Sequence, residues 1–290
     1  MSIYEFTSDS QTTIFKFLKY NSGISTRLLR KFKTIGAFTL NGVPTSIMSE
    51  IQPSDVITVN IEETSGDNLP EDIPIDIIFE DKFILAVNKP PNMILHPTCS
   101  RPTGTLVNAV AFHFASQKID IPIRPVIRLD KDTSGIVIFA KNAFIQEAII
   151  QQMKSKAVKK TYIAVVEGVP NPESGRIDAP ISRLPGSIIT RQVSEDGESA
   201  ITNYKVIKSF DGYSLLEVQP ETGRTHQIRV HMQHIGNPIL SDTLYGTKSE
   251  LINRQALHAY SYSFTHPMNK KSISLTCPLP QDINKLIQHM

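Results

Sequence analysis

The sequence predicts an α+β protein, with a mixed, mostly antiparallel sheet, peripheral helices and a small α/β module at the amino terminus. From Pro74 onward, short apolar runs alternate with turns in an irregular order of strand-like and helix-like patterns, which favours a mixed sheet over a doubly wound one. Charge is also distributed in blocks that divide the chain. We therefore expect a module at residues 1–63, an acidic linker at 64–74 and a larger domain at 75–290.

Composition excludes several classes of protein. The 290 residues are 40% hydrophobic, which is enough for the core of one large or two smaller domains. No apolar run approaches the roughly 20 residues of a membrane-spanning helix. The start MSIYEFTSDS lacks a basic segment followed by an apolar one, so we expect no secretory signal. Cys99 and Cys277 have neither metal-like nor redox-like spacing, so buried cytosolic thiols are the expectation.

The net charge of +2 conceals an uneven distribution. Between Gln11 and Ser49 there are six basic residues and no acidic residue, whereas between Glu62 and Asp81 there are eight acidic residues and no basic residue. From Lys82 to the end there are 24 basic and 16 acidic residues. Two basic bodies separated by an acidic connector indicate a nucleic-acid-binding protein, although charge blocks also occur on ordinary solvated surfaces.

The amino-terminal residues predict two short helices and a small sheet. The expected elements are a helix capped by Thr12 or Thr13, a helix from near Ser25, a strand at 38–40, a turn at Asn41-Gly42 and a strand at 56–61. The first helix carries Ile14, Phe17 and Leu18 on one side.

This pattern resembles the S4 RNA-binding module. The matching residues are Ser25-Thr26-Arg27, Gly36, Asn41-Gly42 and Ser54-Asp55, the last standing where that module usually has Gly-Asp. The resemblance implies phosphate contacts from one side of the second helix, by Arg27, Arg30 and Lys31. A small helical cap with a charged face is the structural alternative.

The larger domain predicts strands and helices in mixed order. Strands are expected at 75–79, 84–88, 136–140, 162–167, 202–208 and 214–219, and helices at 106–116 and 143–157. A further helix is expected from an N-cap at Thr225, because Ile228, Met232 and Ile235 form an apolar stripe that ends before Gly236. His226 and His231 are five residues apart, not the four of a helical metal pair, so no metal site is expected.

One segment combines a carboxylate with an arginine and a glycine-ended turn, namely Arg128-Leu129-Asp130-Lys131-Asp132-Thr133-Ser134-Gly135. A carboxylate in a largely water-free pocket can act as a nucleophile if it stays ionised. A nearby arginine favours the ionised form and typically lowers a carboxylate pKa by about 1–3 units. An aspartate that bonds its own turn is the alternative, and this is our interpretation of Asp132.

Further segments follow along residues 75–290. They are Asn88-Lys89-Pro90-Pro91-Asn92 with His96-Pro97, Lys160-Thr161-Tyr162-Ile163-Ala164 with Gly168, Thr222-Gly223-Arg224-Thr225-His226-Gln227-Ile228-Arg229-Val230-His231, Asp242 with Tyr245-Gly246, and Leu257-His258-Ala259. In this order, with Arg-Leu-Asp, they resemble the RluA family of RNA pseudouridine synthases. The resemblance implies a curved sheet with a basic cleft, an S4 module on a flexible connector, and isomerisation of uridine without a cofactor.

The resemblance also assigns the site residues. Asp130 is the expected nucleophile, Tyr162 stacks on the uracil with its hydroxyl near the C5 proton, and Arg229 pairs with Asp130. Substrate binding is assigned to Arg128, Leu257, Arg224 and Lys89, with Arg128 filling the space that an extruded uridine leaves. The structural alternatives are a packed strand tyrosine, a surface arginine, an Arg128–Asp132 ion pair and a core leucine.

Three residues depart from the family pattern. Ile127 replaces a histidine before Arg-Leu-Asp, Asn92 replaces a glycine after Lys-Pro-x, and Ser241 replaces a glycine before Asp242. Asparagine tolerates positive φ better than most residues, so the turn at Asn92 is expected to survive.

The sequence-based hypothesis is a cytoplasmic, monomeric enzyme that forms pseudouridine in structured RNA, with 23S ribosomal RNA as the expected target and transfer RNA as the other. Its expected partner is RNA, with no DNA, membrane, cofactor or metal. One rival is a non-catalytic RNA-binding or ribosome-assembly protein. Another is a retaining glycoside hydrolase with Asp130 as nucleophile, which needs a second carboxyl group about 5 Å away.

Overall fold

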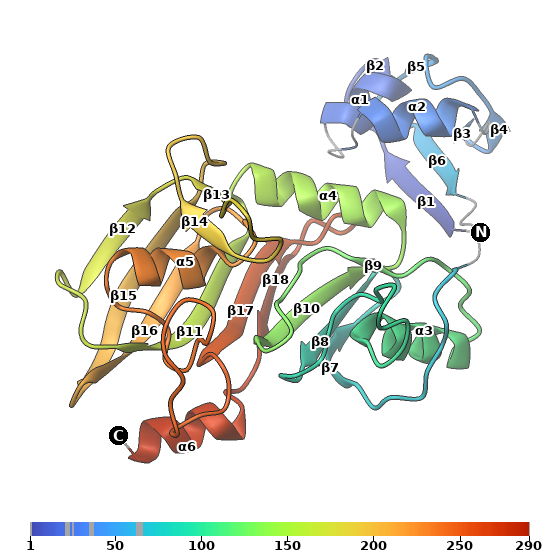
Figure 1. The fold of residues 1–290 in the computed structure, drawn as a ribbon. Coiled ribbons are helices and arrows are strands. Elements are labelled where there is room, and N and C mark those ends of the chain that lie inside the picture. The colour runs from blue at the N-terminus through green and yellow to red at the C-terminus, as the bar shows by residue number, and fades with distance from the viewer. Residues whose placement is uncertain (1, 21–23, 25, 35–37, 62–65, 290) are drawn as a thin grey trace.

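The computed structural model describes residues 2–20, 24, 26–34, 38–61 and 66–289, and the side chains of residues 2, 3, 27, 31 and 61 lie outside the described part. A small amino-terminal module sits at one end of a larger body, and the carboxyl terminus lies at the other end (Figure 1). No described helix is long and apolar enough to span a membrane. The predicted fold class, an α+β protein with a mixed, mostly antiparallel sheet, is confirmed.

In the described residues, the module contains a four-stranded antiparallel sheet in the order β1-β6-β3-β4, a separate β2-β5 pair and two helices. Its elements are β1 (Ser2–Thr7), β2 (Thr12–Thr13), α1 (Ile14–Tyr20), α2 (Thr26–Thr34), β3 (Phe38–Leu40), β4 (Val43–Pro44), β5 (Glu50–Ile51) and β6 (Val56–Ile61). Thr13 caps α1 as predicted, because its hydroxyl accepts a hydrogen bond from the Lys16 amide at 3.3 Å. Strand β1 was not predicted, and it pairs with β6 along its whole length.

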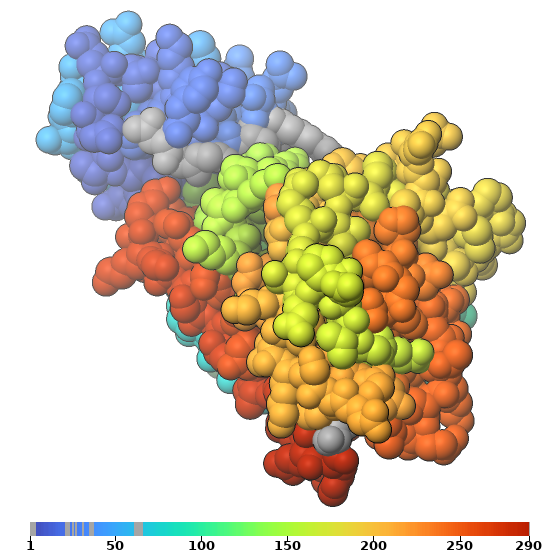
Figure 2. Space-filling model, turned by 90° about the vertical axis from the view of Figure 1, so that its left-hand side faces the viewer, coloured from blue at the N-terminus to red at the C-terminus, as the bar shows by residue number. Residues whose placement is uncertain are grey.

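Aromatic packing fixes the module to the body. Tyr4 of β1 is 2% exposed, and its ring lies 5.9 Å from that of Phe83 and 5.6 Å from that of Phe144, centroid to centroid. Phe6 packs edge-on against Phe144 at 5.7 Å. Figure 2 shows the module, in blue, beside the green helix to which Phe144 belongs. Tyr4 and Phe6 of β1 therefore hold the module against the body, in addition to the connector that joins them.

The acidic connector is also fastened where it is described. The side-chain amide of Asn108 donates to the carbonyl of Leu69 at 2.8 Å, and the Glu71 amide donates to the Asn108 carbonyl at 3.1 Å. The Glu71 carboxylate accepts from the Gly104 amide at 2.6 Å. Residues 69–71 thus run along the helix that contains Asn108.

The body is built on a sheet to which ten described strands contribute. Eight follow the order β12-β15-β16-β11-β17-β10-β8-β7, with β18 beside β17 and β9 beside β10. The strands are β7 (Asp76–Glu80), β8 (Ile84–Lys89), β9 (Arg124–Pro125), β10 (Ser134–Ala140), β11 (Lys159–Glu167), β12 (Ser174–Asp178), β15 (Ile201–Phe210), β16 (Tyr213–Pro220), β17 (Leu257–Thr265) and β18 (Ser272–Thr276). A separate hairpin consists of β13 (Ile181–Arg183) and β14 (Arg191–Val193). Every pairing in the large sheet is antiparallel except that of β10 with β17.

Four helices accompany this sheet in the described residues, namely α3 (Leu106–Ser116), α4 (Ala143–Lys154), α5 (Gln227–His234) and α6 (Gln281–His289). The bounds of α3 agree with the prediction, and a Thr105–Asn108 capping box fixes its start. Helix α4 ends at Lys154, three residues before the predicted end. Strands β9, β12, β13, β14, β17 and β18 and helix α6 were not predicted.

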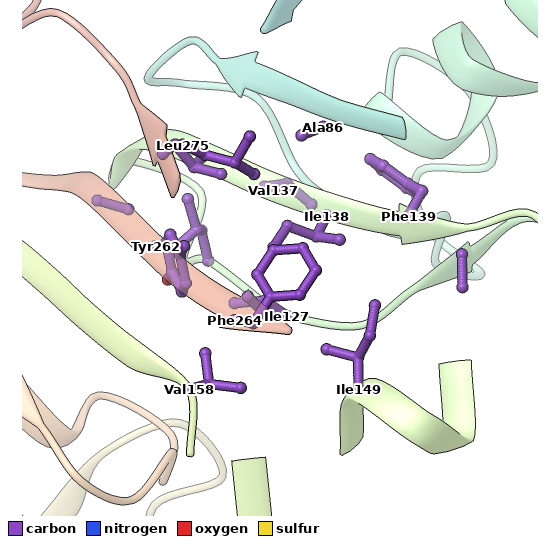
Figure 3. Close-up of a cluster of buried hydrophobic side chains, with 14 of the residues drawn as sticks. Ala86, Ile127, Val137, Ile138, Phe139, Ile149, Val158, Tyr262, Phe264 and Leu275 are labelled. Carbon is purple, nitrogen blue, oxygen red and sulfur yellow. The ribbon is translucent and has the colours of Figure 1, made fainter. Parts of the chain in front are cut away.

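The core of the body lies between β10, β17 and their neighbours. Figure 3 shows apolar side chains of this core, including Phe139 of β10, Tyr262 and Phe264 of β17, Leu275 of β18 and Ile149 of α4. All seven residues of β10 are buried. A strand buried on both faces reads as a continuous apolar run, which is why the sequence predicted β10.

Gly135 makes the parallel pairing of β10 with β17 possible. Its φ is +112°, and a Cβ at this position would lie 2.3 Å from the carbonyl oxygen of Ala259. A side chain at this position would be strained by the positive φ and would also clash with the main chain of β17.

We expect Gly135→Ala to lower the free energy of unfolding by about 3 kcal/mol or more, because strain and a backbone clash add. The matched control is Gly212→Ala, since Gly212 also has a positive φ of +77° but nothing within 4 Å of the added Cβ. That variant should lose only about 1 kcal/mol. Urea unfolding of both variants measures the difference, and equal losses would show that the contact with Ala259 is unimportant.

Candidate active site

A cavity of about 520 Å³ lies over the loop that precedes β10. Its walls come from the 94–98 loop, the 125–133 segment, β11, the loop before α5, α5 itself and the start of β17. The structure brings six of the predicted body residues to this cavity, namely Arg128, Asp130, Tyr162, Arg224, Arg229 and Leu257. Lys89 does not line it.

The segment before β10 alternates buried and accessible side chains. Ile127 and Leu129 are 5% and 8% exposed and belong to the core, whereas Arg128 is exposed and Asp130 is partly exposed. An extended chain alternates in this way, so two apolar anchors direct the arginine and the aspartate to the cavity. Ile127, which departs from the family pattern, is one of these anchors.

Arg229 connects Asp130 to a buried carboxylate. Its Nε and one terminal nitrogen donate to both oxygens of Asp242 at 2.6 and 2.8 Å, and the other terminal nitrogen donates to Asp130 Oδ2 at 2.9 Å. Asp242 is 0% exposed. Burial alone would lower the pKa of Arg229, but the hydrogen bonds and charges of Asp242 and Asp130 outweigh it and raise that pKa. The guanidinium is therefore a fixed positive charge beside Asp130, as predicted.

Helix α5 does not begin as the sequence predicted. Its N-cap is His226, in the left-handed region at φ 57°, rather than Thr225. The side chain of Gln227 holds the preceding loop, because its Oε1 accepts from Thr222 Oγ1 at 2.7 Å and from the Arg224 amide at 2.9 Å. The N-cap prediction is wrong because a glutamine clamp, not a hydroxyl, fixes the entry to the helix.

In the sequence, His226 was quoted as part of a family segment and rejected as a metal ligand, and the structure places it beside Asp130. Its Nε2 lies 3.8 Å from Asp130 Oδ2, and its Nδ1 lies 2.8 Å from the Tyr245 hydroxyl. The Tyr245 oxygen also accepts a hydrogen bond from the Arg191 amide at 2.8 Å, so it joins the hairpin that contains Arg191 to His226. Burial lowers the pKa of His226, which favours the neutral ring beside Asp130. No pattern in the sequence indicates these contacts of His226.

Tyr162 enters the cavity from β11 and is 8% exposed. Its hydroxyl lies 2.6 Å from that of Tyr262, which is completely buried in β17. Burial raises the pKa of Tyr162 to about 12, and the negative charge of Asp130 acts in the same direction. The hydrogen bond with Tyr262 lowers this pKa but does not outweigh them. The phenol is neutral near pH 7. Tyr262 was not singled out in the sequence, because a core tyrosine in a strand carries no distinguishing signal.

Lys89 and Arg254 hydrogen-bond to the main chain of the loop that contains Asp130. Lys89 is 0% exposed, and its ammonium donates to the carbonyls of Pro90, Met93 and Lys131 at 2.8–2.9 Å. Burial lowers its pKa to about 7. Arg254 donates to the Asp132 carbonyl at 3.0 Å. Lys89 thus ties the Asp130 loop to the 90–93 turn, and the prediction that it contacts substrate is corrected to a positioning role.

The remaining predicted residues lie on the cavity wall. Leu257 is buried at the start of β17. Arg224 donates to the Ser199 carbonyl at 3.0 Å and pairs with Glu198. Arg128 forms no ion pair with Asp132 in the described residues, so the structural alternative for Arg128 is not observed. Lys160 donates to the Thr222 carbonyl at 2.8 Å, and burial lowers its pKa to about 8.

Two departures from the family pattern have a common backbone explanation. Asn92 and Ser241 stand where the pattern has glycine, and their φ angles are 60° and 59°. Both turns keep the left-handed conformation without glycine. The tolerance expected for Asn92 is confirmed.

Among the described residues that line the cavity, Asp130 is the one carboxylate. The neighbouring Asp242 is fully buried and has both oxygens bonded to Arg229. A retaining glycoside hydrolase needs a second carboxyl group as acid and base, so the described cavity does not support that alternative.

In the module, Arg30 is exposed on α2. Arg27 and Lys31 belong to the same helix, but their side chains lie outside the described residues.

Comparison with known proteins agrees with this geometry. The family model described as RNA pseudouridylate synthase matches residues 83–234. The chain is 39% identical over 269 residues to "Uncharacterized RNA pseudouridine synthase YjbO" of Bacillus subtilis, covering 92% of this chain and 95% of that protein. It is 38% identical over 239 residues to "Ribosomal large subunit pseudouridine synthase D" of Xanthomonas campestris, covering 78% and 72%. The fold also resembles the solved structure "Human RNA Pseudouridylate Synthase Domain Containing 4", with a TM-score of 0.60 at 24% identity over 73% of this chain and 92% of that one.

Proposed function

This chain belongs to the RNA pseudouridylate synthase family, and on that premise we propose that it modifies uridine in large-subunit ribosomal RNA with Asp130 as the nucleophile. Isomerisation of uridine to pseudouridine in RNA is the activity of the family. The observation that supports Asp130 is its contact with Arg229 in a cavity whose volume is typical of small-molecule sites.

The geometry supports a division of labour between three side chains. Asp130 forms a bond to the uridine as the glycosidic bond breaks and is released again when the base re-attaches through C5, while Arg229 keeps the carboxylate ionised. The ring of Tyr162 offers a flat apolar face on which the detached uracil stacks. After the base is re-attached through C5, the C5 proton must leave, and the Tyr162 hydroxyl takes up that proton as it passes its own to a water molecule in the cavity.

Ribosomal RNA is the proposed target for two reasons. Relatives of this chain carry the name ribosomal large subunit pseudouridine synthase D. The amino-terminal module, with Arg27, Arg30 and Lys31 on α2, would add phosphate contacts outside the active site. We propose that this module is an S4-type RNA-binding domain and that the enzyme acts as a cytoplasmic monomer. Transfer RNA is the alternative target.

Mapping of pseudouridine tests the target. Total RNA from cells with and without the gene should differ at one or a few uridines of large-subunit ribosomal RNA, and the purified chain should restore them in an unmodified transcript. Loss of transfer-RNA sites instead would select the alternative target. If every site persisted in the deletion strain, the ribosomal proposal would fail.

We expect Tyr162→Phe to lower kcat by about 100-fold with little change in KM, because the stacking face remains and the proton relay is lost. Tyr262→Phe is the matched control, since it removes the same hydrogen bond but leaves the cavity hydroxyl in place. Its kcat should stay within about fivefold of the wild type. Single-turnover rates on the transcript measure both, and a fully active Tyr162→Phe would exclude the relay.

A further inference from the structure

A second hollow, of about 450 Å³, lies beside the active-site cavity. It is enclosed by the β13–β14 hairpin, the 196–198 turn and the loop before α5. Four arginines line it, and we call it the arginine pocket: Arg128, Arg183, Arg191 and Arg224. Arg128, Arg224 and the backbone at Gly223 and Thr225 also line the active-site cavity, so the two hollows share a wall.

The pocket carries an excess of positive charge. Its acidic side chains are Asp196 and Glu198, of which Glu198 pairs with Arg224. Arg128 and Arg183 are exposed and make no hydrogen bond or ion pair with any described side chain. Arg191 donates through one terminal nitrogen to the Ile189 and Thr190 carbonyls, which directs its guanidinium without neutralising it. Unpaired guanidinium groups in a hollow suit a phosphate, which they bind bidentately.

The walls of the pocket are held in place by the main chain. The amide and carbonyl groups of Ile181 and Glu198 exchange two hydrogen bonds of 2.9 Å. A Cβ on Gly197 would lie 2.6 Å from the Ile181 backbone, so the turn is packed directly on β13. The Arg191 amide is bound by Tyr245, whose hydroxyl also contacts His226 beside Asp130. The hairpin is therefore tied to the active site rather than only adjacent to it.

We propose that the arginine pocket binds the sugar–phosphate backbone of the RNA next to the target uridine. This rests on the proposed function in one respect, namely that the flipped uridine occupies the cavity containing Asp130. Because the two hollows share Arg128 and Arg224, the bound phosphates belong to the nucleotides immediately beside the flipped one. The pocket thus recognises backbone and carries no base preference of its own.

The test compares Arg183→Gln and Arg191→Gln with Arg176→Gln in the full-length chain. Arg176 is an exposed arginine of β12 that does not line the pocket. The first probe is a fluorescein-labelled ten-residue oligouridylate, whose binding is followed by anisotropy from 50 to 300 mM salt. Each pocket variant should weaken binding by about tenfold and reduce the slope of log Kd against log salt by about 0.7. Arg176→Gln should match the wild type.

The second probe is the unmodified large-subunit ribosomal RNA transcript. On it, the pocket variants should raise KM by about tenfold and leave kcat within about twofold, because backbone binding stabilises the enzyme–RNA complex and the transition state equally. If the pocket variants matched Arg176→Gln on both probes, the pocket proposal would be overturned. If they weakened oligouridylate binding while the wild type formed no pseudouridine in the transcript, the pocket would stand and the ribosomal target would fail.

Discussion

Asp130→Asn is expected to abolish pseudouridine formation, by at least about 10⁴-fold, while RNA affinity stays within about threefold of the wild type. Asparagine has the same shape, and its carbonyl oxygen still accepts the Arg229 hydrogen bond that Asp130 Oδ2 accepts at 2.9 Å. The loop should keep its position, because Ile127 and Leu129 anchor it in the core. What is lost is the negative charge and the nucleophilic oxygen, so the change affects chemistry rather than binding.

Release of tritium from a transcript labelled at uridine C5 measures this loss, because the C5 hydrogen leaves in every turnover. Asp132→Asn is the matched control, since Asp132 is two residues away in the same loop and does not line the cavity. It should retain at least about half of the wild-type rate. An Asp130→Asn enzyme within tenfold of the wild type would remove Asp130 as nucleophile, and with it the reason for the Arg229 contact.

The pairing of Asp130 with Arg229 could be predicted because each lies in a recognisable local motif. The two residues are 99 positions apart, and no periodicity connects them. The family resemblance predicted the pairing, and its physical reason is that a nearby arginine keeps a carboxylate ionised. Asp242 was quoted only as part of a motif, although it holds the guanidinium with both oxygens. A buried carboxylate in a loop looks like a turn residue until its partner is located in space.

Other parts of the site could not be predicted because their signals are not local. Tyr262 contacts Tyr162 across two paired strands, and the β11–β17 register shifts between Thr161 and Tyr162 at that point. The position of His226 depends on its own left-handed backbone at the start of α5. The helical pattern of the sequence does not indicate that conformation. Lys89 was predicted at the correct motif but with the wrong contact, because a lysine beside an active-site loop reads as a substrate ligand until its burial is known.

The elements that were missed share a physical reason. Strands β13 and β14 have three residues each, too few for an alternation pattern to be recognised. Strand β1 precedes the residues from which the module was inferred, and its pairing with β6 depends on tertiary contact. Long apolar segments such as β10 and α3 were found, because burial on several sides leaves a continuous signal.

Arg229→Gln is expected to damage stability and activity together. The change leaves Asp242 fully buried without the two hydrogen bonds that neutralise it, and removing one partner of a buried ion pair typically costs about 3–5 kcal/mol. The guanidinium also lies 5.1 Å from the centre of the Tyr245 ring, so that cation–π contact is lost as well. Urea unfolding should show the loss of stability, and the tritium-release rate should fall by at least about 100-fold.

The double variant Arg229→Gln with Asp242→Asn separates these two effects. An asparagine at 242 removes the buried charge and can hydrogen-bond the introduced glutamine, so most of the lost stability should return. Activity should not return, because Asp130 still lacks its positive partner. If the double variant regained the wild-type rate, Arg229 would serve only to neutralise Asp242. A folded but inactive double variant would instead place the function of Arg229 at Asp130, where a fixed guanidinium keeps the carboxylate charged and aimed at the cavity.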